Sequence, residues 1–158
     1  MAASAARMSP EFALVAALEA VPVLRDGVTP MQPRKDRQAP FAFYIPTADT
    51  EEQLLDGPSG LQSFSATLHL VAATYRHLQL ISSLAKQAVL GMRGTVYRTP
   101  ADDEAAGLKG QVLIEYTEMD QSGPDLYEAS VGLYRRMYTV RLDYQTVEVI
   151  EDEEVLSG

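Results

Sequence analysis

The first apolar repeat along the chain has the spacing of a helix. Its apolar members fall on one stripe: Leu14, Leu18 and Val21. The preceding Ser9-Pro10 pair is typical of a helix start, because Ser caps free N–H groups and Pro suits the first helical position. We therefore predict a helix that begins at Ser9 and ends before Pro22, preceded by a flexible N-terminus over residues 1–8.

A second, longer helix is predicted from Thr74 to Met92. Its apolar positions follow the alternating three- and four-residue spacing of a buried stripe: Leu78, Ile81, Ala85, Ala88 and Met92. Gly91 and Gly94 provide a C-terminal stop. Leu80 and Leu90 fall outside that stripe and are expected on the exposed side of the helix.

Alternation of apolar and polar residues predicts the strands. The expected strands are Phe41–Ile45, Ser63–Ala72, Gln111–Met119 and Leu133–Tyr144, with shorter ones near Val28, at Thr95–Arg98 and over Val147–Ile150. In the last long strand Tyr134, Tyr138, Val140, Leu142 and Tyr144 share a face that Arg136 interrupts. Turn-rich connections are expected at Thr47–Gly60 and Asp120–Gly132, and a flexible acidic loop at Pro100–Gly110.

This order of elements predicts an α+β fold. We expect an antiparallel or mixed sheet of four to six strands with two helices packed on one face, formed by a single domain over residues 9–150. Residues 151–158 are expected to be an acidic, solvated tail. The segment Ser63–Arg98 is open to another interpretation, a right-handed parallel crossover.

Composition and charge narrow the classes of function. The chain has 158 residues, a length typical of one domain, with 22 acidic and 13 basic residues and a net charge of −9. That acidity argues against a general nucleic-acid binder, which needs Lys and Arg to neutralise phosphates. The absence of Cys excludes disulfides, thiolate catalysis and Cys-based zinc sites. No apolar run is long enough for a membrane span, so we expect a soluble domain that folds inside the cell.

The sequence shows no arrangement of catalytic, metal-binding or cofactor-binding residues. It has no P-loop, dinucleotide fingerprint or G-x-S-x-G elbow. His69 and His77 are expected to be structural, because no Asp or Glu occurs from Gly57 to Pro100 to complete a metal site. Asp125 and Glu128 follow a spacing found in some nucleases, but an acidic surface turn explains them equally well. We therefore expect a protein that is not an enzyme and needs no metal or cofactor.

Charge is unevenly distributed along the chain. Residues 57–100 contain four basic side chains and no acidic one: Arg76, Lys86, Arg93 and Arg98. Chance and the avoidance of repulsion are one explanation. The other is a subunit whose basic helical side meets the acidic side of an identical neighbour. In that case the candidate subunit interface consists of Arg76, Leu80, Lys86 and Leu90.

A second basic group lies in a proline-rich segment. Arg34, Lys35 and Arg37 are expected in an exposed loop between Pro30 and Pro40. A solvated loop is the simpler interpretation, and a contact with an acidic protein or with nearby DNA is the functional one.

The order of these motifs resembles one known family. It runs from the helix Phe12–Leu18 through a Val-Thr-Pro strand at Val28, Pro40-Phe41-Ala42-Phe43-Tyr44 and Leu55-Asp56-Gly57-Pro58-Ser59-Gly60-Leu61. A long helix opened by Thr74-Tyr75 follows, and then Asp125-Leu126-Tyr127-Glu128 leads into Gly132-Leu133-Tyr134-Arg135-Arg136. Over residues 9–149 this arrangement is similar to the small tail-completion proteins of long-tailed bacteriophages, which include tail terminators and tail-to-head joining proteins.

The resemblance implies a structural virion protein at the tail–neck junction, assembled in the host cytoplasm. It implies a homo-oligomeric ring, usually a hexamer, that ends growth of the tail tube and joins the tail to the head. The tail tube protein and a head-completion or neck protein are the implied partners, with genomic DNA passing through the ring. The candidate interface would then lie at subunit contacts, and the loop of Arg34, Lys35 and Arg37 would contact a neighbouring ring or the lumen.

Two alternatives remain open at this stage. A head-closure or other neck ring protein would also be small and oligomeric. A small cytoplasmic enzyme or ligand-binding domain would instead use the tyrosines of the last strand as a pocket wall, although Tyr134, Tyr138 and Tyr144 are more simply sheet and core residues.

Overall fold

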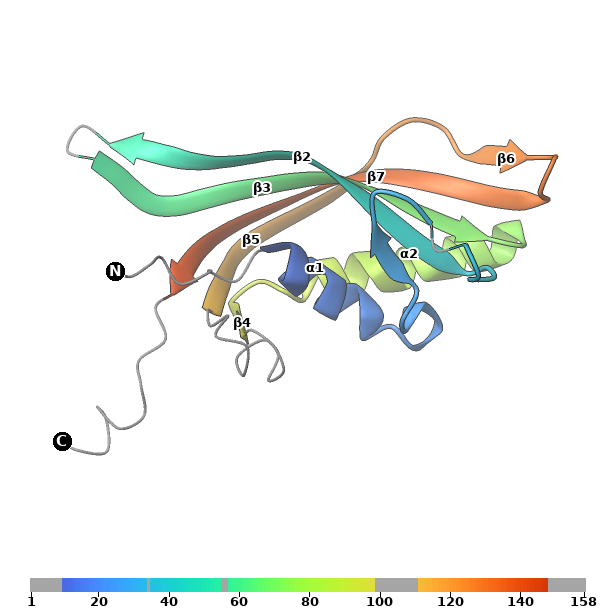
Figure 1. Cartoon of the computed structure of the whole chain (residues 1–158), viewed down its shortest axis with the longest axis horizontal. Coiled ribbons are helices and arrows are strands. Elements are labelled where there is room, and N and C mark those ends of the chain that lie inside the picture. The colour runs from blue at the N-terminus through green and yellow to red at the C-terminus, as the bar shows by residue number, and fades with distance from the viewer. Residues whose placement is uncertain (1–9, 34, 55–56, 99–110, 148–158) are drawn as a thin grey trace.

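The computed structural model describes residues 10–33, 35–54, 57–98 and 111–147 (Figure 1). In chain order the elements are α1 (Pro10–Glu19), η1 (Pro22–Leu24), β1 (Val28–Pro30), β2 (Phe41–Leu54), β3 (Gly57–Ala72), α2 (Tyr75–Leu90), β4 (Thr95–Arg98), β5 (Gln111–Gln121), β6 (Leu126–Glu128) and β7 (Leu133–Val147). Four expectations lie outside the described residues: the flexible N-terminus, the acidic loop at 100–110, a strand beyond residue 147 and the acidic tail.

The strands form one curled, mixed sheet in the order β1-β2-β3-β7-β5-β4, with β6 paired to β7 beyond the end of β5. β1 runs parallel to β2, and the other pairs are antiparallel. The expected α+β class is therefore confirmed. Over the described residues the sheet has seven strands, because the connection expected at Asp120–Gly132 contains the three-residue β6. The parallel crossover does not occur, because the three successive antiparallel pairings from β3 through β7 and β5 to β4 make β4 antiparallel to β3.

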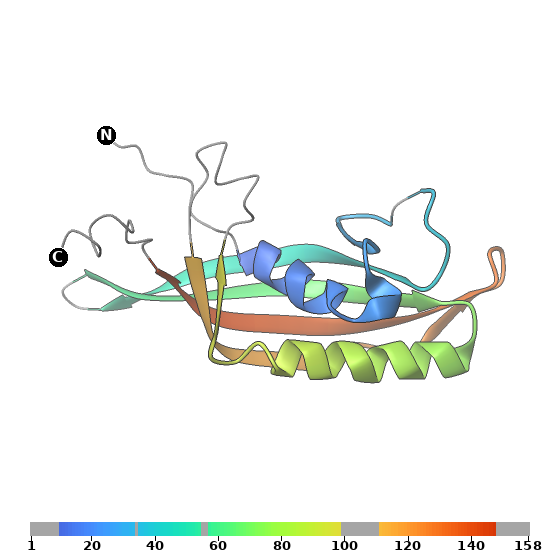
Figure 2. The same cartoon turned by 90° about the horizontal axis from the view of Figure 1, so that it is seen from below.

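Both helices cover the same face of the sheet, as expected (Figure 2). Alternation along β3 and β7 directs one set of side chains into the core beneath the helices, since successive side chains of a strand point to opposite faces. This core includes Leu14 and Leu18 of α1, Leu78 and Ile81 of α2, Phe64, Ala66, Leu68 and Leu70 of β3, and Tyr138, Val140, Leu142 and Tyr144 of β7. The tyrosines of the last strand are thus core residues, except that Tyr134 is only partly buried.

The opposite side of the sheet, called the open face below, has a small apolar cluster of its own at the end where β2 begins. Phe41, Phe43 and Val71 are all less than 9% exposed there. His69 stacks on Phe43 with 4.4 Å between ring centroids and adds to this cluster.

The expectation of a polar connection over Thr47–Gly60 is wrong. β2 continues to Leu54 and pairs with β3 from Gly57 onward, with register shifts between Pro46 and Ala48 and again near Glu51. The pairing is made by backbone hydrogen bonds, which do not require the apolar alternation that identifies a half-buried strand. The paired strands reach well beyond both helices at one end of the molecule (Figures 1 and 2).

Candidate functional site

Helix α2 is the element around which the candidate site is built. Its start is defined by Thr74, whose Oγ1 accepts a hydrogen bond from the backbone N–H of His77 at 3.1 Å, satisfying one of the free donors of the first turn. Its end is defined by Gly91, whose N–H donates to the carbonyl of Gln87. Leu78 and Val89 are fully buried on its inner face, so the orientation of the helix is set by core packing.

The outward side of α2 brings the four predicted interface residues together: Arg76, Leu80, Lys86 and Leu90. We call this set the α2 outer face. All four are exposed, with Leu80 at 55% and Leu90 at 37%. At 3.6 residues per turn they fall within an arc of about 120°. Each basic residue precedes a leucine by four positions, which places the members of each pair side by side.

The α2 outer face combines apolar and positive character. The helix has no Asp or Glu, and the positions between the four residues are neutral and polar: Gln79, Ser83 and Gln87. Because neither basic side chain has an acidic neighbour on its own helix, the face is uncompensated within α2. A surface that combines exposed apolar groups with positive charge favours association with an acidic partner.

A cluster of tyrosines and one arginine adjoins the start of α2, and the sequence did not predict it. The rings of Tyr127 and Tyr134 lie 4.6 Å apart, and Tyr75 meets Tyr134 edge-on at 5.9 Å. Arg136 lies 5.9 Å from the centre of the Tyr75 ring. Tyr75 and Tyr127 remain 44% and 56% exposed, which extends the accessible surface of α2 past its N-terminus.

The arginine of this cluster is held by a bidentate ion pair. Arg136 donates from Nε to Oδ1 of Asp125 at 2.7 Å and from Nη2 to Oδ2 at 2.8 Å. These bonds hold the pKa of the Asp125 carboxyl below its usual range. Glu128 pairs with Arg135 at 3.2 Å. Asp125 and Glu128, the two acids whose spacing is found in some nucleases, are therefore both engaged in ion pairs. This agrees with the simpler interpretation, an acidic turn at the surface. The signal in the sequence was Arg136, which interrupts an apolar alternation.

The basic loop is not a single exposed group. Lys35 is exposed, and Arg34 lies outside the described residues. Arg37 folds back instead, donating to the backbone carbonyls of Arg25 and Val23 at 3.1 Å each. The side chain passes so close to Gly27 that a Cβ there would lie 2.9 Å from the guanidinium carbon. Arg37 thus ties the loop to the segment before β1. Its guanidinium is engaged within the molecule, whereas the side chain of Lys35 is exposed to solvent.

The two histidines occupy different sides of the molecule. His69 lies on the open face and is 8% exposed, whereas His77 is exposed on α2. Burial lowers the pKa of His69, and the nearby Arg135 lowers it further. Among the residues that the structure describes, no three His, Asp or Glu side chains are grouped so that they could hold a metal ion.

We compared the chain with models of protein families and with curated proteins, and it matches none of them. Within the described ranges neither helix has the length and apolar character needed to cross a membrane. The α2 outer face and the adjoining tyrosine–arginine cluster both expose apolar or aromatic side chains beside arginine or lysine, a composition found at contacts between proteins.

Proposed function

We propose that this chain is a structural virion protein that forms a ring at the head-proximal end of a bacteriophage tail. The ring ends growth of the tail tube and joins the tail to the head or neck, and genomic DNA passes through its centre. Its partners are further copies of itself, the tail tube protein and a neck protein. The proposal starts from the resemblance of the chain to tail-completion proteins in the order of its motifs.

The observation that supports the proposal most directly is the α2 outer face. A ring subunit needs a surface that contacts its neighbour, and the α2 outer face provides one, with two exposed leucines beside two cations that have no acidic neighbour on the helix. The remainder of the chain is strongly acidic, so an identical copy is itself a suitable partner for that face. A contact between two different surfaces of the same chain is heterologous, and it closes into a ring when the rotation between subunits permits.

The overall charge also agrees with a DNA conduit. A net charge of −9 on each subunit repels phosphate, so DNA can pass through a channel of such subunits without adhering. The buried Tyr138 and Tyr144 are core residues, which weakens the alternative of a ligand pocket lined by the last strand.

The test is deletion of the gene from the phage genome that the proposal requires, followed by negative-stain electron microscopy of the lysate. Filled heads detached from overlong or variable tails indicate a terminator. Detached heads beside tails of normal length indicate a joining protein, and binding of the chain to tailless capsids indicates a head-closure ring. Intact virions in the deletion lysate, or a gene that lies outside any phage genome, would overturn the proposal.

A further inference from the structure

The open face has an acidic strip along β5 and β7, on the side of the sheet opposite to α2. Its members are Glu115, Glu118, Asp120 and Asp143. For Glu118, Asp120 and Asp143 the orientation follows from the strand alternation, because the neighbouring Thr117, Met119 and Leu142 are buried under the helices. Glu115 lies in the register shift between Ile114 and Tyr116 and contacts Gln145, which is on the open face. In the antiparallel register of β5 and β7, Glu118 lies opposite Arg141 and Asp120 lies opposite Thr139. The side chains of Glu118, Asp120 and Arg141 therefore lie on the same side of the sheet.

Internal contacts hold the strip in place without neutralising it. Arg141 makes a bidentate pair with Asp143 at 3.0 and 2.9 Å, and its Nη1 lies 3.9 Å from Oε2 of Glu118. Gln145 donates to Oε2 of Glu115 at 3.3 Å. Asp143 and Glu118 thus share the one guanidinium group within the strip, and Glu115 is contacted only by a neutral amide.

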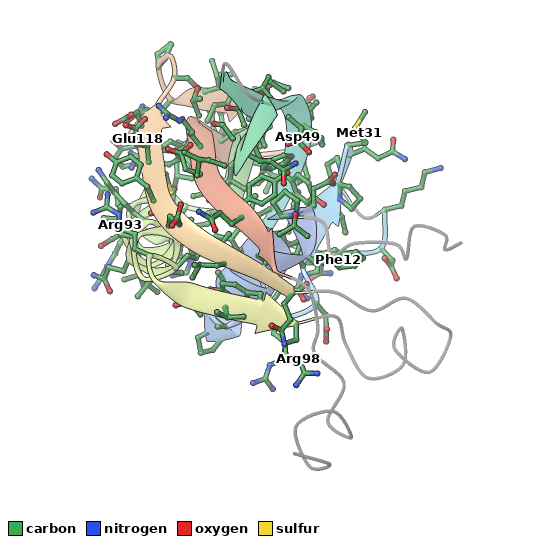
Figure 3. The ribbon with its side chains drawn as sticks, turned by 90° about the vertical axis from the view of Figure 1, so that its left-hand side faces the viewer. Phe12, Met31, Asp49, Arg93, Arg98 and Glu118 are labelled. Carbon is green, nitrogen blue, oxygen red and sulfur yellow. The ribbon has the colours of Figure 1, made fainter. Side chains whose placement is uncertain are left out.

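The border of the strip has apolar and basic groups. Tyr116 lies among the carboxylates and is 40% exposed, and Val96 on the adjacent β4 is 48% exposed. Arg93 stands over the Tyr116 ring at 4.6 Å and donates to the carbonyl of Thr117, so it limits the strip on this side. Figure 3 shows Arg93 and Glu118 on the same side of the molecule. With Arg93 and Arg141 included, the region retains more carboxylates than guanidinium groups.

The strip and the α2 outer face complement each other in charge, apolar content and length. The two cations of α2 are separated by ten residues, which is about 15 Å along the helix axis. From Glu115 to Asp120 the carboxylates extend over roughly 16 Å of strand. Each surface also has two exposed apolar side chains, Leu80 and Leu90 on the α2 outer face and Tyr116 and Val96 at the strip. Because the sheet lies between the two surfaces, a single molecule cannot bring them together.

We propose that the α2 outer face of one copy docks on the acidic strip of a second copy, which makes this the heterologous contact of the ring. That such contacts close into a ring rests on the proposed function. The contact between two copies does not depend on it, because both surfaces belong to this chain. We therefore expect charge reversal on either surface to disrupt assembly, and reversal on both surfaces to restore it.

The test uses the full-length chain and three variants. The first variant is R76E/K86E, the second is E118K/D120K, and the third combines all four substitutions. The control variant is Arg25→Glu, an exposed charge reversal in the turn before β1, outside both surfaces. Sedimentation velocity at low salt measures self-association, and circular dichroism verifies that each variant retains its fold.

We expect the first and second variants each to associate about tenfold or more weakly than the unmodified chain, with the control unchanged. The combined variant, and an equimolar mixture of the first two, should associate again. Added salt should weaken every assembly that forms, because exposed charges are screened. If the E118K/D120K variant associates as strongly as the unmodified chain, or if the unmodified chain remains monomeric at millimolar concentration, the inference is wrong.

A second measurement covers the case in which a charge variant unfolds. The chain has no cysteine, so Leu80→Cys and Tyr116→Cys together introduce the only two thiols. Oxidation should give disulfide-linked ladders of subunits if the two surfaces meet, and unlinked monomers if they do not. Failure here with detached heads in the deletion lysate would reject this contact while leaving the proposed ring function intact.

Discussion

Leu78 and Leu80 lie two residues apart on α2, and the structure assigns them opposite roles. Leu78 is fully buried in the core beneath the sheet, whereas Leu80 is 55% exposed on the α2 outer face. Leu78→Ala removes buried apolar atoms from the hydrophobic core and leaves a cavity. The two effects together should lower the free energy of unfolding by about 3 kcal/mol. Leu80→Ala leaves no cavity, so its effect on the folded monomer should stay within about 0.5 kcal/mol.

Thermal unfolding followed by circular dichroism separates the two variants. For a chain of this length the Leu78→Ala variant should melt about 6–12 °C lower, because each kcal/mol corresponds to about 2–4 °C. The Leu80→Ala variant should melt within about 2 °C of the unmodified chain under conditions in which both are monomeric, yet show weaker self-association. Equal losses of stability in the two variants would refute the assignment of the inner and outer faces of α2.

Three further substitutions test local features of the structure. Thr74→Ala removes the cap that accepts from His77 and should lower the free energy of unfolding by about 1 kcal/mol, measured by urea denaturation, whereas Thr74→Ser should retain most of it. Asp125→Asn concerns pH: the pKa of Asp125 is lowered by Arg136 in the folded state, so its contribution to stability is present above the unfolded pKa and is lost as pH falls through the folded pKa. Unfolding curves between about pH 5 and pH 2 should therefore fall less steeply for Asp125→Asn, and an unchanged slope would contradict the linkage. Arg37→Ala removes the bonds that tie its loop to backbone carbonyls and should speed limited proteolysis within residues 31–40, and cleavage at the unmodified rate would contradict that role.

The parts of the fold that the sequence predicted are those in which burial determines the pattern. The second helix was expected over Thr74–Met92 and lies at Tyr75–Leu90, because its buried stripe and capping residues indicate helix without reference to the rest of the chain. The core side of β3 was also predicted, since Phe64 to Leu70 alternate against a helix-covered face. In both elements the apolar periodicity and the tertiary packing favour the same structure.

The parts that were missed depend on partners far away in the sequence. The second half of β2 is polar, and its strand conformation comes from pairing with β3. β6 is only three residues long and depends on β7 in the same way. Such non-local backbone pairing leaves little trace in local composition.

In the candidate site, too, the features set by local spacing were predicted and those that join distant segments were missed. Helical spacing placed Arg76, Leu80, Lys86 and Leu90 on one exposed face, and the structure has them there. The tyrosine–arginine cluster was not predicted, because it joins α2, β6 and β7 across the fold. Arg37 was expected to be exposed with Lys35, but its guanidinium instead satisfies backbone carbonyls near β1. A charge run alone does not distinguish a solvated side chain from one that organises a loop.

The most direct measurement of the central proposal is the position of the chain in the assembled particle. Antibodies raised against the purified protein and coupled to gold would be applied to intact virions and to tails separated from heads, and viewed by electron microscopy. The account predicts label at the junction between head and tail, and at one end only of separated tails. Label along the tail shaft, at the distal tip or on the capsid shell, or virions that lack the protein altogether, would contradict it.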